Sequence, residues 1–84
     1  MLSKQLETAI EKAKIFKVYD KGRYTIYFEE WHDVTELHIK QSGQLLIKII
    51  KNNVTGIKTV AYEKEEGSKA EKRQIKEIKD YFNL

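Results

Sequence analysis

The sequence has no cysteine and no proline. Without cysteine the chain has neither a disulfide framework nor a thiolate zinc site. Its longest apolar run, "LLIKII" at 45–50, is interrupted by a lysine and is far shorter than the roughly 20 residues that span a bilayer. The start of the chain, "MLSKQLETAIEKAK", is amphipathic and carries acids, unlike a secretory signal. We therefore expect a cytoplasmic protein that does not contact membranes.

Glycine is also scarce, and its four copies stand far apart at the boundaries between predicted elements. They cannot build a glycine-rich phosphate loop. The three serines fall at predicted helix starts or in turns, and neither histidine has an acid and a nucleophile at a spacing that hydrolases use. We therefore predict that the chain is not an enzyme and uses no cofactor.

A metal site is the remaining chemical possibility, because "EEWHDVTELH" at 29–38 holds both histidines and four acids. His32, Glu36 and His38 would share one face if the strand extended that far. Along a straight strand the two histidines would lie about 20 Å apart, too far to share one ion. We therefore predict no metal site.

The charge of the chain excludes little. Its 84 residues suffice for one domain, 1–84, with 16 cations against 13 anions and a net charge of +3. Lysine outnumbers arginine fourteen to two, whereas base and phosphate readout favours the arginine fork. Composition alone therefore argues only weakly for a nucleic-acid partner.

Apolar periodicity predicts a helix at each end of the chain. Near the amino terminus Ser3 can cap a helix over 3–14, and "IFKVY" at 15–19 then begins an extended segment that "DKG" ends. Near the carboxyl terminus Ser68 and Glu71 make a capping box for a second helix. The first helix has a six-residue apolar stripe: Leu2, Leu6, Ala9, Ile10, Ala13 and Phe16. The second has a three-residue stripe: Ile75, Ile78 and Phe82.

Alternating or apolar runs separated by turn residues predict strands between these helices: "RYTIYFE", "VTELHIK", "LLIKIIK" and "GIKTVAYE". Their short connections favour an antiparallel meander of neighbouring strands. We predict an α+β fold of the αββββα type, with four to five strands and both helices packed on one face of the sheet.

Strict alternation assigns an unusual number of apolar residues to the other sheet face. A solvated antiparallel face usually carries polar residues, so this face is expected to be covered by a partner. We predict a non-enzymatic binding module that contacts an unidentified protein and forms a homodimer through this face, unless a helix crosses over to cover it. The predicted interface residues are Leu46, Ile50, Val60, Tyr62 and Tyr27.

The alternative function is nucleic-acid binding through cations on the second helix, where Lys69, Lys72, Arg73 and Lys76 form one exposed stripe. Lys69 and Arg73, like Lys72 and Lys76, are like charges at i, i+4, although pairing with nearby acids would make a merely solvated face tolerable. A sheet site is also conceivable, in which Lys48 and Lys58 meet phosphates while tyrosines stack on bases.

One segment, "GSKAEKRQ" at 67–74, resembles the start of the second helix in double-stranded RNA-binding domains. The resemblance covers eight residues, and it implies phosphate contacts by Lys69, Lys72 and Arg73. The chain departs from that family by an expected extra strand and by lacking its Gly-Pro loop that ends in histidine.

Overall fold

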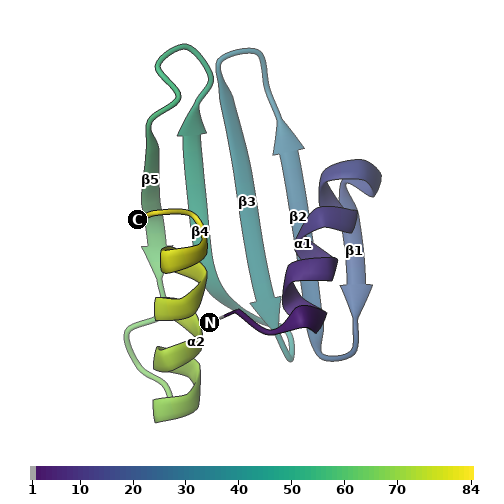
Figure 1. Cartoon of the computed structure of the whole chain (residues 1–84), viewed down its shortest axis with the longest axis vertical. Coiled ribbons are helices and arrows are strands. Elements are labelled where there is room, and N and C mark those ends of the chain that lie inside the picture. The colour runs from purple at the N-terminus through teal and green to yellow at the C-terminus, as the bar shows by residue number, and fades with distance from the viewer. Residues whose placement is uncertain (1) are drawn as a thin grey trace.

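The computed structural model describes residues 2–84, which form one five-stranded antiparallel sheet and two helices (Figure 1). The strands lie in sequence order, so every connection within the sheet is a hairpin. The predicted fold class is confirmed. The elements in chain order are α1 (Lys4–Phe16), β1 (Val18–Lys21), β2 (Tyr24–Glu30), β3 (Val34–Gln41), β4 (Gln44–Asn52), β5 (Lys58–Glu63) and α2 (Lys69–Tyr81).

Both helices begin at the predicted serines. The Ser3 hydroxyl accepts a hydrogen bond from the Leu6 N–H at 3.2 Å. The Ser68 hydroxyl accepts one from the Glu71 N–H at 3.1 Å, and the Glu71 carboxylate accepts one from the Ser68 N–H at 3.0 Å. This reciprocal pair confirms the capping box.

The first helix is longer than predicted. Ile15 and Phe16 are helical rather than extended, and the helix ends at Lys17, whose φ is 72° and whose N–H donates to the Ala13 carbonyl. Ile15 is 69% exposed and Phe16 60% exposed. Because neither side chain faces the core, the apolar period stops before the helix does.

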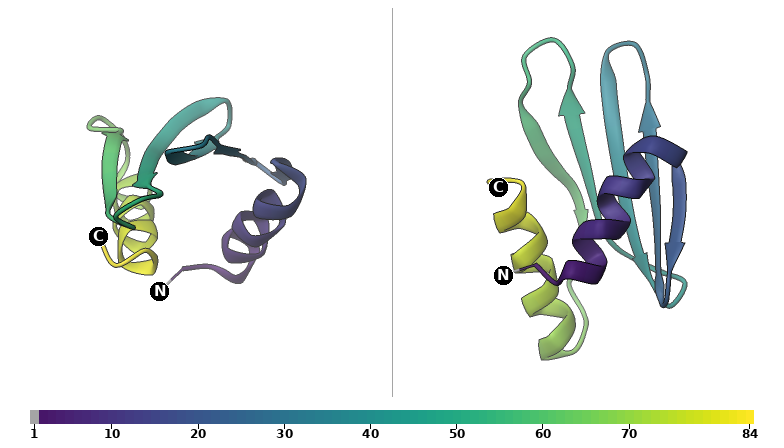
Figure 2. Two further views of the ribbon diagram at one scale, coloured as in Figure 1. Left: turned by 90° about the horizontal axis from the view of Figure 1, so that it is seen from above. Right: turned by 45° about the vertical axis from the view of Figure 1, so that its right-hand side comes forward.

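Both helices lie on one face of the curved sheet, as Figure 2 shows from above. Helix α1 packs against β1 and β2, and α2 lies beside β4. Gln74 of α2 also donates a hydrogen bond to the Tyr24 hydroxyl of β2. The core between the layers consists of Leu6, Ala9, Ile10, Ala13, Tyr24, Ile26, Leu37, Ile39, Leu46, Ile47, Ile49, Ile75 and Ile78. No helix or strand formed by residues 2–84 covers the opposite face of the sheet.

Two register shifts interrupt the alternation of the strands. Ile39 is opposite Ile47 and Lys40 is opposite Leu45, so Leu46 is an extra residue in β4. Lys48 is opposite Tyr62 and Ile49 is opposite Val60, so Ala61 is an extra residue in β5. Beyond each bulge, residues that simple alternation places on one face lie on the other.

Candidate functional site

The uncovered sheet face is the candidate functional site, and we call it the outer face. Register places a row of four side chains directly across it, one from each of β2 to β5: Tyr27, His38, Lys48 and Tyr62. The full outer face comprises Val18, Asp20, Thr25, Tyr27, Glu29, Val34, Glu36, His38, Lys40, Leu45, Lys48, Ile50, Asn52, Thr59 and Tyr62.

Aromatic contacts order one half of this row. The Tyr27 and His38 rings meet edge to face, with centroids 6.5 Å apart and planes at 75°. The Lys40 ammonium lies 5.4 Å from the centroid of the Tyr27 ring, within range of a cation–π contact. At the other end of the row, Tyr62 is 44% exposed on the edge strand. A partner on this face would therefore meet one supported tyrosine and one exposed tyrosine.

Glu36 organises the polar half of the outer face. Its Oε1 lies 3.2 Å from Lys48 Nζ and 3.2 Å from His38 Nε2, so one carboxylate joins two members of the row. The hydrogen bond from Lys48 lowers the pKa of Glu36, and the contact with His38 lowers it further, while partial desolvation opposes both effects. Glu36 therefore stays ionised and holds Lys48 against the sheet.

The outer face carries nearly balanced charge. Its two lysines, Lys40 and Lys48, stand against three acids, which gives −1 with the histidine neutral. The acids are Asp20, Glu29 and Glu36. The net +3 of the chain therefore resides on other surfaces, and this face does not present a field that attracts a polyanion.

Two residues that we expected on the outer face are in the core instead. Leu46 is fully buried in the core cluster, and Val60 packs against that cluster opposite Ile49. The bulges in β4 and β5 cause both errors, because each adds one residue and reverses the alternation. Leu45, the residue before the bulge in β4, lies on the outer face opposite Lys40. Ile50, Tyr62 and Tyr27 are on the outer face as expected.

Lys58 was expected beside Tyr27 and Tyr62, but it lies on the other face of the sheet. Register pairs it with Lys51 on the helix-covered face, away from Tyr27 and Tyr62. A sheet site that combines Lys58 with the two tyrosines is therefore wrong. Lys48 does lie between them, although Glu36 already engages its ammonium group.

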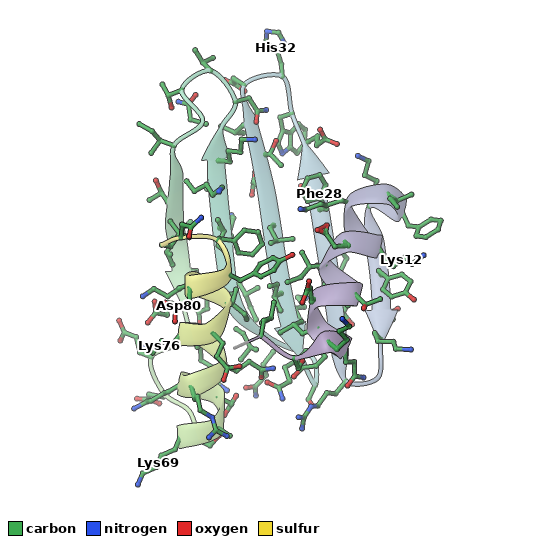
Figure 3. The ribbon with its side chains drawn as sticks, in the orientation of Figure 1. Lys12, Phe28, His32, Lys69, Lys76 and Asp80 are labelled. Carbon is green, nitrogen blue, oxygen red and sulfur yellow. The ribbon has the colours of Figure 1, made fainter. Side chains whose placement is uncertain are left out.

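The predicted cationic stripe of α2 is exposed. Lys69, Lys72, Arg73 and Lys76 are all accessible, and Figure 3 shows Lys69 and Lys76 pointing away from the sheet. Lys76 lies 3.5 Å from Asp80 in an exposed pair. The five cations and three acids of α2 sum to +2. This helix is a cationic surface, although its acids moderate the charge.

The two histidines are well separated. His32 lies at the tip of the β2–β3 turn (Figure 3), whereas His38 is in the middle of β3 and contacts Glu36. Among residues 2–84 there is no group of three or more histidine, cysteine or acidic side chains that could hold a metal ion.

Comparison with protein-family models, with curated protein sequences and with solved structures finds no match to this chain. Within the described part of the chain, neither helix has the length and apolar character needed to cross a membrane. The outer face and the cationic surface of α2 are therefore the two candidate sites of the described chain.

Proposed function

We propose that the chain is a non-catalytic binding module that forms a homodimer through its outer face. The observation that carries the proposal is the row from Tyr27 to Tyr62, with Leu45 and Ile50 beside it, on a sheet face that no helix of the described chain covers. Tyrosine is enriched among the residues that contribute most to binding energy in protein interfaces, and the centre of such an interface is more apolar than the rest of the surface.

Charge favours a second copy as the occupant of this face. A two-fold axis presents the same patch to itself, so a patch with both signs can pair its own cations with its own acids. Asp20 and Lys40 lie in one row of the outer face, on either side of Thr25 and not in contact with each other, so each can face the opposite charge of a second copy. Two sheets packed face to face also bury both outer faces at once. We also propose a cytoplasmic location for the protein, because a chain without cysteine needs no oxidising compartment to fold.

The test is the mass of the protein in solution. Sedimentation equilibrium from about 1 to about 500 µM should show a concentration-dependent rise from 10.0 kDa towards twice that mass. A mass that stays at one chain across this range contradicts the dimer.

A matched pair of variants locates the interface. Ile50→Lys places a cation on the outer face directly opposite Glu36, where it can pair within one chain, so the monomer should remain folded. In the dimer it buries charge at the interface, and we expect the mass to fall to that of one chain. Val54→Lys is the control, because Val54 is 85% exposed at the β4–β5 turn and off the outer face. If the two variants have equal masses in solution, the outer face is not the dimer interface.

A second candidate function is nucleic-acid binding through α2, favoured by the exposure and like-charge spacing of its cations. Phosphate contacts release counterions, so binding should weaken steeply between about 50 and 200 mM salt. Fluorescence anisotropy with single- and double-stranded oligonucleotides measures this directly. Binding should be lost after three lysine-to-glutamine changes, Lys69, Lys72 and Lys76. It should persist after the same changes at Lys4, Lys12 and Lys21, which lower the net charge equally.

A further inference from the structure

A cavity of about 430 Å³ lies on the helix-covered face, between the ends of the two helices. Lys14 in the last turn of α1 and Phe82 at the end of α2 form its two sides. We propose that this cavity binds a small amphiphile that has an apolar body and one anionic head group. The site is on the opposite side of the sheet from the outer face and does not depend on the proposed dimer.

The floor of the cavity is apolar. Phe28, Leu37 and Ile49 follow one another in register across β2, β3 and β4. Leu37 is 5% exposed and Ile49 is 4% exposed, so they belong to the core, while Phe28 packs against its edge. Phe82 adds an aromatic side wall from α2. The lining is mixed, with four apolar side chains below a polar and charged rim, and such a division suits a ligand that has an apolar body and a polar head.

The rim of the cavity is cationic. The next row in register runs from Glu30 through Thr35 and Lys51 to Lys58, and all four residues line the cavity. Lys51 and Lys58 stand directly opposite each other on the same face, an arrangement that destabilises an antiparallel pair. A bound anion between or beside the two ammonium groups would relieve this repulsion.

Lys14, the third cation of the rim, is favoured by its position in a helix, whereas Lys51 and Lys58 are not. Lys14 is in the last turn of α1, where the helix dipole favours a cation, and it pairs with Glu11 at 3.2 Å. Lys51 and Lys58 belong to strands, which have only small net dipoles. Their placement above an apolar floor therefore points to a ligand more strongly than Lys14 does.

The acid at the rim already has a partner. Glu30 lies 2.5 Å from Lys17 Nζ, so Lys17 compensates its charge. Glu30 therefore does not neutralise Lys51 or Lys58. The neutral polar groups at the rim also contact each other, since Thr35 Oγ1 donates to Asn53 Oδ1 at 2.8 Å and Asn53 Nδ2 donates to the Trp31 carbonyl at 3.1 Å. Charge complementarity thus selects an anionic head group over a cationic or neutral one.

The first experiment compares three head groups on one apolar chain. Amide chemical shifts of the ¹⁵N-labelled full chain are followed during titration with decanoate, decanol and decyltrimethylammonium, each below its micelle-forming concentration. Decanoate should produce saturable shifts in the strand residues that line the cavity and should bind about tenfold more tightly than decanol. Absence of saturable shifts, or equal affinity for decanoate and decanol, would overturn the proposal.

The second experiment removes the two cations. Both lysines are exposed, so the double variant Lys51→Gln and Lys58→Gln should fold, and relief of their repulsion should slightly stabilise it. Decanoate affinity should fall about fivefold or more, towards that of decanol. The control double variant Lys69→Gln and Lys72→Gln changes the net charge equally and should leave the affinity within about twofold. An unchanged affinity in the cavity variant would overturn the anion-binding role, whatever the oligomeric state of the protein.

Discussion

The two faces of the sheet differ in residue type and in burial. On the helix-covered face, Ile26, Ile39 and Ile47 are fully buried, and their neighbours are almost all apolar. On the outer face, tyrosines and charged side chains are interspersed with aliphatic residues, without an apolar majority. The covered face accounts for the stability of the chain, because burial of apolar area is the main favourable term in folding. The outer face contributes less to that stability, so its side chains are available for the contacts proposed above.

Leu45 and Leu46 give the strongest test of this difference between the two faces, because they are adjacent in sequence. Leu46 is fully buried in the core cluster, whereas Leu45 lies on the outer face. Leu46→Ala should lower the free energy of unfolding by roughly 2–5 kcal/mol, because it removes apolar contacts and leaves a cavity. Leu45→Ala should lower it by less than about 1 kcal/mol. Urea unfolding of both variants, at a concentration where the protein is monomeric, measures the difference.

Similar losses for the two leucine variants would contradict the bulge at Leu46. A large loss for Leu45→Ala that appears only at high protein concentration would have a different meaning. It would show that the outer face is buried in a dimer, since assembly makes apparent stability depend on concentration.

Much of this fold follows from local sequence patterns. Serine caps and apolar stripes located both helices, and alternation with turn residues located the strands. The assignment of faces failed where β4 and β5 carry bulges. Residues 45–47 are all apolar, so no change of residue type marks Leu46 as the extra one. Pairing with the neighbouring strand decides which of the three turns outward, and that pairing is not a local property.

The same limit applies to the functional surfaces. Tyr27, Ile50 and Tyr62 could be placed on the outer face by counting along their strands. The opposition of Lys51 and Lys58 could not, because it requires the register across the β4–β5 bulge. The cavity beside them also requires the positions of both helix ends. Sequence patterns therefore predicted the elements, while the sites arise from how those elements are paired and packed.

The smallest expected difference between the two sheet faces comes from the ion pair of Glu36 on the outer face. Glu36 accepts hydrogen bonds from Lys48 and His38, and the Lys48 contact lowers its pKa in the folded chain. Between this lowered pKa and the ordinary value of 4.5, the unfolded chain binds more protons than the folded chain. The stabilisation is therefore present above the ordinary value and is lost as the pH falls through the folded value.

Glu36→Gln should consequently cost less than about 1 kcal/mol near pH 7, and this cost should be smaller at pH 4, below the ordinary value of 4.5. Urea unfolding of the parent and the variant at the two pH values measures it. Repeating the comparison in a Lys48→Gln background should shrink the cost near pH 7, because Lys48 is the main partner of Glu36. A cost that is the same at both pH values would mean that the ion pair contributes nothing. The outer face would then contribute to the stability of the chain through its other contacts, such as the Tyr27–His38 ring contact and the Thr25–Asp20 hydrogen bond.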